Sequence, residues 1–423
     1  MPELVIRGGT VVDARGARRA DVVVADGRVV AVGENLTADE VVDAGGCIVA
    51  PGLVDLHSHL RQPGQEEAET VETGSRAGAL GGYTALVAMP NTTPAIDSAA
   101  MVHEVLDLGR SALCDIHVAG AITIGREGEK LAPIGEMAAL GARLFTDDGR
   151  GVQDARLMRR AMEYASDLDV ILAQHCEDEA IAQGGAMHEG EWSSRLGLPG
   201  QPAEAEELMV QRDLALARLT GARVHFQHLS TAGSLAMVRA ARAAGLPVTA
   251  EATTHHFTLT HAACAGYDPV LKVNPPLRTE EDREAVRAGL ADGALDAIAT
   301  DHAPHAPHLK ELPFDQAPPG MLGLETALAL ALTELELPIV QVLALMSWQP
   351  AAIAGLVDHG GPIELGRPAH LCVIDPTHEW VVDPALLASR ARNTPYAGRR
   401  LLGKVRHTLL GGELTVRDGE AQR

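Results

Sequence analysis

Two histidines stand one residue apart behind a short apolar run in LVDLHSHLRQPG, residues 53–64. In a strand, residues i and i+2 point to the same side, so the imidazoles of His57 and His59 can bind one object together. Imidazole nitrogens are common ligands of divalent metals. A polar strand end near solvent would also explain the pair, so the metal hypothesis depends on ligands from elsewhere in the chain.

Further polar residues stand where other short apolar segments end. They are Asn91, Asp147, Asp148, His175, His228, Asp301, His302 and His305. A core strand has no use for a charged or imidazole group at its end unless a partner lies there. If the strands are parallel and form one barrel, these ends surround a single mouth. Four histidines and two aspartates converging there would suit two divalent metals, most simply Zn²⁺.

The elements that must position these residues alternate along the middle of the chain. From residue 53 to residue 301, eight short apolar segments alternate with alanine-rich helical stretches. This pattern predicts an α/β fold, a (β/α)8 barrel of the TIM type. A doubly wound open sheet would alternate too, but the glycine-rich phosphate loop that usually follows its first strand is absent.

The two ends of the chain differ from the middle. Residues 1–52 and 356–423 are rich in short β segments, and Asp26-Gly27 between two valine-rich runs predicts a hairpin. We therefore expect the ends to pair into one small β domain, 1–52 plus 356–423. The barrel domain, 53–355, would interrupt it.

Charge and cysteine usage limit the partners. A net charge of −22 argues against nucleic acid and anionic membranes, so an anionic small substrate would need a local cation. The five cysteines are scattered and form no CxxC pair, which is typical of reduced thiols in a cytoplasmic protein. The first residues do not resemble a secretory signal, and no uncharged apolar run is long enough to span a membrane.

Motifs spread over the barrel resemble a known family. They are PGLVDLHSHLRQPG, MPNTTP, FTDDGRGVQ, QHCED, QHLST, KVNPPLR, IATDHAPH and GLETAL, between Pro51 and Leu328. The chain is similar to the amidohydrolase superfamily and, within it, to bacterial dihydroorotases. The resemblance implies a distorted (β/α)8 barrel with a β-sandwich from both chain ends. It also implies a hydrolase with two Zn²⁺ ions per subunit, or one, that reversibly cyclises N-carbamoyl-L-aspartate to L-dihydroorotate and water in de novo pyrimidine (UMP) synthesis.

The resemblance also implies roles for single residues. His57, His59 and Asp301 would bind one metal, His175 and His228 the second, and Asp148 would bridge both. Asp147 would then either support the metal ligands from behind or cap the loop. Asp301 would also be the catalytic acid–base. The implied substrate contacts are Arg61, Asn91, Asn274, His305, Pro319 and Gly320, the last two in a segment that departs from the family's usual Pro-Phe-Gly. Arg61, Asn91 and His305 would contact the substrate's α-carboxylate, the guanidinium of Arg61 through two parallel hydrogen bonds.

Several alternatives stay open at this point. A hydantoinase or allantoinase usually bridges its metals with a carboxylated lysine, but none of Lys130, Lys272, Lys310 and Lys404 stands at the end of the fourth strand. A non-catalytic scaffold subunit of aspartate transcarbamoylase would typically lack the metal-site histidines. A homodimer and a complex with that transcarbamoylase are both compatible with an active enzyme.

Three further histidines are expected to have structural roles. His255 and His256 are expected at the end of the seventh strand, where they would support the mouth by hydrogen bonding. His225 stands an odd number of residues before His228, so we expect its side chain to face the opposite side.

Overall fold

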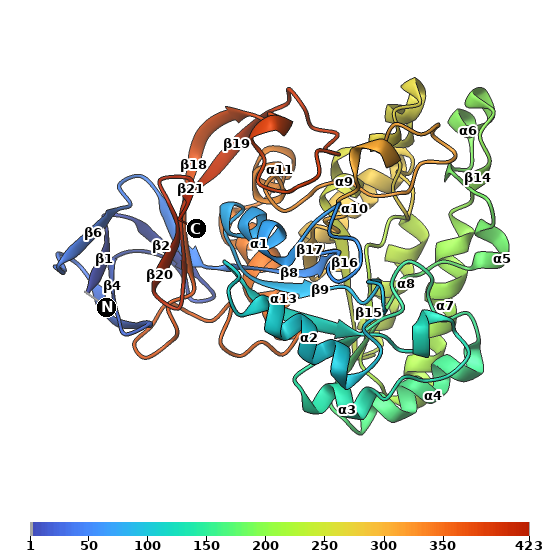
Figure 1. Cartoon of the computed structure of the whole chain (residues 1–423), viewed down its shortest axis with the longest axis horizontal. Coiled ribbons are helices and arrows are strands. Elements are labelled where there is room, and N and C mark those ends of the chain that lie inside the picture. Colours follow the sequence, from blue (N-terminus) through green and yellow to red (C-terminus); the bar gives the residue numbers. More distant parts are fainter. Residues whose placement is uncertain (1–2, 423) are drawn as a thin grey trace.

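The computed structural model describes residues 3–422 as a barrel with a pair of β-sheets beside it (Figure 1). Eight parallel strands form the barrel sheet, in the order β17 (Ala297–Ala299), β16 (Val248–Thr253), β15 (Val224–Phe226), β12 (Ile171–Gln174), β11 (Leu144–Phe145), β10 (Asp115–Gly120), β9 (Tyr83–Ala88) and β8 (Leu53–Ser58). The two edges meet where Ser58 pairs in parallel with His302. The predicted (β/α)8 barrel is therefore confirmed.

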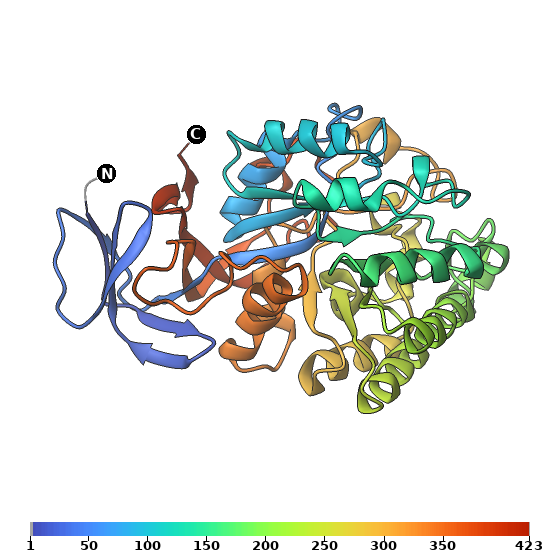
Figure 2. The same ribbon diagram turned by 90° about the horizontal axis from the view of Figure 1, so that it is seen from below.

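Helices surround the barrel strands, as the view from below shows (Figure 2). They are α1 (Val71–Leu80), α2 (Ala99–Gly109), α3 (Ile134–Ala139), α4 (Ala155–Ser166), α7 (Glu204–Thr220), α8 (Ala232–Ala243), α10 (Glu280–Asp292), α11 (Ala327–Glu334), α12 (Ile339–Leu343) and α13 (Gln349–Ile353). No helix among residues 3–422 combines the length and the apolar character needed to cross a membrane.

Local sequence signals explain where these helices begin. The side chain of Asp154 accepts hydrogen bonds from the backbone N–H groups of Arg156 and Leu157, which caps the start of α4. The buried residues of α4 recur at helical spacing and turn one face of the helix inward. They are Met158, Ala161, Met162 and Ala165.

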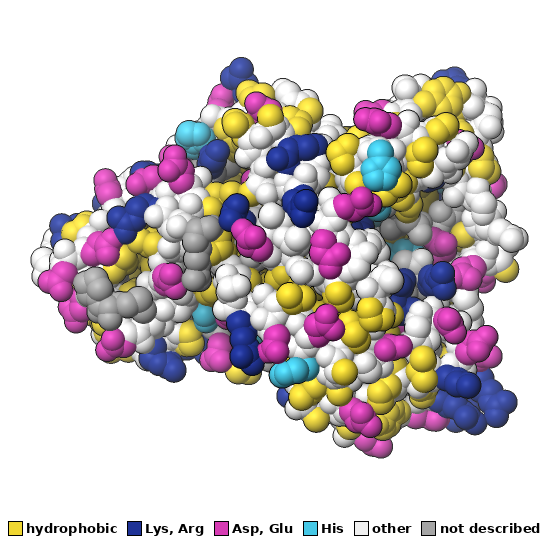
Figure 3. Space-filling view, viewed as in Figure 1, with side chains coloured by type: hydrophobic (Ala, Val, Ile, Leu, Met, Phe, Trp, Pro, Cys, Tyr) yellow, Lys and Arg dark blue, Asp and Glu magenta, His cyan; other side chains and the backbone are white. Residues whose placement is uncertain are grey.

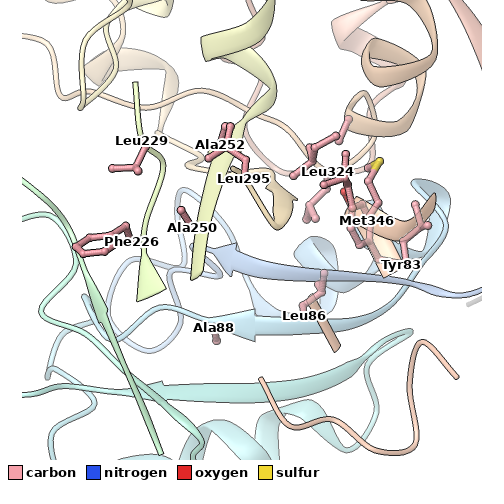
Figure 4. Close-up of a cluster of buried hydrophobic side chains, with 14 of the residues drawn as sticks. Tyr83, Leu86, Ala88, Phe226, Leu229, Ala250, Ala252, Leu295, Leu324 and Met346 are labelled. Carbon is pink, nitrogen blue, oxygen red and sulfur yellow. The ribbon is translucent and has the colours of Figure 1, made fainter. Parts of the chain in front are cut away.

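Small and aliphatic side chains fill the core between strands and helices (Figure 4). All six residues of β9 are buried, because helices cover one face and the barrel interior the other. Tyr83 and Leu86 of β9 belong to the same buried cluster as Phe226, Leu324 and Met346. Few aromatic side chains are needed to fill this core, because buried alanines let strands and helices approach each other closely.

Both chain ends contribute to the sheets beside the barrel. Four N-terminal strands form one sheet, in the order β5 (Arg28–Gly33), β4 (Asp21–Ala25), β1 (Leu4–Arg7) and β6 (Glu40–Asp43). The other sheet has seven strands, in the order β21 (Glu420–Ala421), β20 (Glu413–Arg417), β19 (Arg400–Leu410), β18 (Leu371–Val381), β7 (Ile48–Pro51), β2 (Thr10–Asp13) and β3 (Gly16–Arg19).

A shared core joins these two sheets into a sandwich. Ile6 and Val22 of the first sheet pack in one buried cluster with Val49 and Val373 of the second. The hairpin predicted at Asp26-Gly27 connects β4 and β5 and is confirmed. The domain limits at 52/53 and 355/356 stay predictions.

Two local expectations differ from the structure. His255 and His256 lie in a short helix, α9 (Thr254–Thr258), and not at a strand end, because β16 stops at Thr253. The chain between β12 and α7 also forms an arm that the sequence pattern did not indicate (Figure 1). It contains α5 (Glu179–Ala182), β13 (Met187–His188), α6 (Glu191–Leu196) and β14 (Gly200–Gln201).

Candidate metal centre and active site

The carboxyl ends of the barrel strands surround a cavity of about 170 Å³. Eleven of the twelve residues predicted for the site line it: His59, Arg61, Asn91, Asp148, His175, His228, Asn274, Asp301, His305, Pro319 and Gly320. The twelfth, His57, is fully buried and lies against Asp148. Residues far apart in the sequence therefore meet in one place.

Asp148 lies at the centre of a group of four imidazoles. Its Oδ1 atom is 3.3 Å from His57 Nε2, 3.6 Å from His175 Nδ1 and 3.7 Å from His228 Nε2. Its Oδ2 atom is 3.6 Å from His59 Nε2. The carboxylate thus presents one oxygen to three histidines and the other to the fourth, an arrangement that suits a bridging ligand.

Asp301 completes the cluster from the end of the last barrel strand. Its Oδ1 atom is 2.9 Å from His59 Nε2 and 3.5 Å from His57 Nε2. Burial would raise the pKa of Asp301, but the charge of His57 and the hydrogen bond from His59 outweigh it and hold the pKa well below its usual range. Asp301 is therefore ionised at neutral pH and can accept a proton.

The donor atoms of this cluster fit a divalent metal. His57 Nε2, which faces Asp148, is buried without a hydrogen-bond partner among the described residues. An unpaired buried polar atom is costly unless another group satisfies it. The ligand atoms of His57, His59 and Asp301 lie within 4.8 Å of one another, and so do those of His57, Asp148 and His228. Buried nitrogen and carboxylate ligands converging in this way are typical of zinc sites.

Three residues at the mouth have a strained backbone. The φ angle is +61° at Arg61, +34° at His228 and +44° at Asp301, in a region that side chains other than glycine rarely adopt. Each such residue costs on the order of 1–3 kcal/mol, and such strain often gathers at functional sites. Here the positive φ angles direct the side chains of Arg61, His228 and Asp301 into one cavity.

His225 was expected to face away from His228, and this prediction is wrong. The His225 side chain lies inside the barrel, where its Nε2 atom is 3.1 Å from Glu251 Oε2. Strand β15 ends at Phe226, and the positive φ at His228 turns the chain, so strand alternation does not extend to His228.

Glu251 contacts two buried histidines, His57 and His225, and the sequence analysis did not indicate it. Its Oε1 atom is 3.1 Å from His57 Nδ1, so that Nδ1–H can donate to the carboxylate while Nε2 faces the cluster. Burial would raise the pKa of Glu251, but hydrogen bonds from His225 and His57 bring it to about 2. A lone acidic residue in the apolar strand VTAEAT is the one signal that could have indicated it.

Asp147 points away from the cluster. Its Oδ1 atom accepts hydrogen bonds from the backbone N–H groups of Ile122, at 2.8 Å, and Thr123, at 3.0 Å. Asp147 also accepts a bond from the Thr123 hydroxyl. This side chain therefore ties the end of β11 to the loop after β10, while its neighbour Asp148 faces the histidines.

The lysines of the chain lie outside the cluster. Lys272 Nζ donates to the Asp315 carbonyl, and Lys310 Nζ donates to the carbonyls of Pro269 and Pro318. Lys404 Nζ lies 4.8 Å from the centre of the Trp380 ring. Lys130 is exposed in the loop after β10. Among the described residues, then, no lysine stands where a carboxylated side chain would bridge two metals.

Two asparagines predicted to contact substrate also contact histidines. Asn91 Oδ1 accepts a hydrogen bond from His59 Nδ1 at 2.9 Å, and Asn91 Nδ2 donates to Asp148 Oδ2 at 3.3 Å. Asn274 Nδ2 is 3.3 Å from His175 Nε2. Both side chains line the cavity, so they can orient the histidines and still face a ligand.

A cation, Arg61, and a neutral imidazole, His305, also line the cavity. Arg61 is buried, and burial lowers its pKa to about 10, so the guanidinium stays charged at neutral pH. Its Nε atom donates to the Pro304 carbonyl at 3.1 Å. His305 donates from Nε2 to the Pro319 carbonyl at 2.8 Å, and burial lowers its pKa to about 3. The cavity therefore offers a fixed positive charge beside an ionised carboxylate.

The sequence of the chain is similar to those of known proteins over nearly its whole length. A family model described as "Dihydro-orotase-like" matches residues 46–234. The dihydroorotase of Pelotomaculum thermopropionicum is 48% identical over 98% of this chain and 99% of its own length. That of Streptomyces coelicolor is 49% identical over 99% of this chain and 100% of its own length.

Solved structures also resemble the chain. An L-hydantoinase (dihydropyrimidinase) from Arthrobacter aurescens superimposes with a TM-score of 0.90 at 25% identity, covering 100% of this chain and 98% of that one. The likeness therefore extends over both the barrel and the sandwich of this chain.

Proposed function

The chain belongs to the dihydroorotase family, and on that premise we propose that its barrel mouth reversibly cyclises N-carbamoyl-L-aspartate to L-dihydroorotate and water. One observation carries the proposal: the guanidinium of Arg61 and the ionised carboxylate of Asp301 line the same cavity of about 170 Å³. A cation for the substrate's α-carboxylate therefore lies beside a base for its amide chemistry. This reaction belongs to de novo pyrimidine synthesis.

We propose that the cluster holds Zn²⁺, with two ions per subunit or one. His57, His59 and Asp301 would hold the first ion, His175 and His228 the second, and Asp148 would bridge them. Divalent cations at such a site make water acidic enough to ionise near neutral pH and polarise a carbonyl group. The unpartnered Nε2 of His57, which faces Asp148, supports this assignment.

The protein's own residues would bind the substrate and move protons. In the hydrolytic direction, Asp301 accepts the proton of the attacking water and delivers it to the leaving ring nitrogen. In the forward direction, it removes a proton from the ureido nitrogen. Arg61, Asn91 and His305 hold the α-carboxylate, and Asn274 is a further substrate contact in the same cavity. The backbone of Pro319 and Gly320 forms part of the cavity wall around the substrate.

A hydantoinase or allantoinase is the alternative within this fold. The structural likeness to an L-hydantoinase supports it, whereas Arg61 and the Asp148 position support dihydroorotase. Purified protein should be assayed side by side with N-carbamoyl-L-aspartate, dihydrouracil, hydantoin and allantoin. We expect turnover of the first to exceed the others by orders of magnitude. Preferred turnover of hydantoin or allantoin would overturn the proposal.

The equilibrium of the proposed reaction should depend on pH. Ring closure consumes one carboxylate and takes up one proton, so acidic pH favours dihydroorotate and alkaline pH favours N-carbamoyl-L-aspartate. The equilibrium ratio should change about tenfold per pH unit near neutrality. Chromatography of both compounds after equilibration from either direction measures the ratio. A ratio that did not vary with pH would exclude this reaction.

Replacing Arg61 by methionine should separate substrate binding from catalysis. Arg61→Met removes the cation that faces the α-carboxylate, so KM for N-carbamoyl-L-aspartate should rise by about tenfold or more. Dihydrouracil has no carboxylate, so any slow activity on it should change much less. Equal losses on the two substrates would mean that Arg61 only supports the backbone around Pro304.

The proposed reaction needs a small-molecule substrate and leaves the assembly state of the protein open to experiment. A homodimer and a complex with aspartate transcarbamoylase are compatible with it, because an active dihydroorotase can work alone or in an assembly. Sedimentation of the purified chain, alone and mixed with that transcarbamoylase, would distinguish a monomer, a homodimer and the complex.

A further inference from the structure

A segment between the two longest strands of the sandwich crosses to the barrel mouth. It contains Asn393, which is buried with 4% exposure. The Nδ2 atom of Asn393 donates to the carbonyls of Ala303, at 3.0 Å, and Gly320, at 3.1 Å. Its Oδ1 atom accepts from the backbone N–H of His305 at 3.2 Å. One amide therefore joins both ends of the loop that follows β17.

The segment that carries Asn393 is itself held by two carboxylates. Glu69, fully buried, accepts hydrogen bonds from the Ser389 hydroxyl and from the Arg390 backbone N–H, the latter at 3.1 Å. Glu325 Oε1 accepts from the Ala388 backbone N–H at 2.8 Å. The residues before Asn393 are thus fixed to the barrel, so its amide is a rigid support.

Only an amide satisfies all three backbone groups. A primary amide has two N–H donors and one carbonyl acceptor, and Asn393 uses both donors and the acceptor. A carboxylate would face two carbonyl oxygens with no proton to donate. An alanine would leave three backbone groups unpaired, at about 1–3 kcal/mol for each one that stays buried.

The loop ends that Asn393 joins carry proposed substrate contacts. His305 follows Ala303 by two residues, and Gly320 follows Pro319, whose carbonyl accepts the Nε2–H of His305 at 2.8 Å. We propose that Asn393 is a positioning residue that sets the place of His305 relative to the Pro319–Gly320 backbone. It would thereby determine the preference for substrates that carry an α-carboxylate. This inference rests on the function proposed above.

The test compares Asn393→Ala and the milder Asn393→Ser with a matched neighbour, Thr394→Val. Thr394 is also buried, but among residues 3–422 its hydroxyl accepts only from the Tyr396 backbone N–H in its own turn. In both Asn393 variants we expect KM for N-carbamoyl-L-aspartate to rise by about tenfold. We expect kcat to fall less, and kcat/KM for dihydrouracil and the bound metal to change less than threefold. Thr394→Val should keep the wild-type KM.

Three results would overturn the inference. They are an unchanged KM in both Asn393 variants, equal losses on the two substrates, and a KM in Thr394→Val that rises as much as in Asn393→Ala. The last two would mean that the segment acts through overall stability.

A measurement without substrate separates this inference from the proposed function. Amide hydrogen exchange of residues 303–322 should speed up in Asn393→Ala and stay near wild type in Thr394→Val, because the His305 N–H loses its acceptor. Wild-type protein inactive on N-carbamoyl-L-aspartate would refute the proposed function, whatever this exchange shows. Unchanged exchange in Asn393→Ala would refute the positioning role, whatever the wild type turns over.

Discussion

Asp301→Asn should reduce kcat by at least ~10²–10⁴-fold in both directions, the usual contribution of a general acid–base. The replacement keeps the size of the side chain but removes the carboxylate whose low pKa keeps it ready to accept a proton. It also weakens the contacts at 2.9 and 3.5 Å with His59 and His57, so one metal should bind less tightly.

The measurement is steady-state kinetics on both substrates, with metal content determined on the same samples. Asp292→Asn is a matched control, because Asp292 is a half-exposed carboxylate at the end of α10 that pairs with Arg239 away from the mouth. The control should keep wild-type kcat. Turnover of Asp301→Asn close to wild type, with metal retained, would remove this residue from the mechanism.

Asp148→Ala should abolish activity through the loss of metal. Four histidines face the two oxygens of this carboxylate at 3.3–3.7 Å, so its removal leaves both proposed ions without their shared ligand. We expect the variant to retain at most one ion and to lose kcat by several orders of magnitude, on the scale at which active-site groups act. Metal analysis and kinetics measure both effects.

The neighbouring aspartate is the control that this chain offers. Asp147→Ala should keep the metals, because its carboxylate bonds to Ile122 and Thr123. It should instead lower the free energy of unfolding by about 1–3 kcal/mol, since buried donors lose their acceptor. Metal-stripped wild type should regain activity with Zn²⁺ and no bicarbonate. A bicarbonate requirement, or metal loss in both variants alike, would overturn the aspartate bridge.

Much of the fold could be predicted from local patterns. Apolar segments separated by alanine-rich stretches indicated the barrel, and the Asp-Gly pair indicated the β4–β5 hairpin, because both signals depend on neighbouring residues. The arm that contains α6 and β14 was not predicted. Its strands are two residues long, too short for a period-2 pattern to appear in the sequence.

Site residues on strand ends were easier to predict than those that support them. Polar groups that end apolar segments are visible in the sequence, and seven of them line one cavity: His59, Asn91, Asp148, His175, His228, Asp301 and His305. Glu251 and Asn393 were missed because their contacts are with residues far away in the sequence, 194 residues for Glu251 and 73–90 for Asn393. His225 was misplaced because a positive φ at His228 cannot be read from strand alternation.

The pairing of β7 with β18 has a consequence for the order in which the protein is made. About 320 residues separate Pro51 from Leu371, so at ~5–20 residues per second the ribosome needs roughly 16–64 s to deliver the second strand after the first. During that time the backbone edge of β7 that faces β18 has no partner and can pair with another nascent chain. Asn393 emerges later still. The barrel mouth is therefore among the last parts of the protein to be completed.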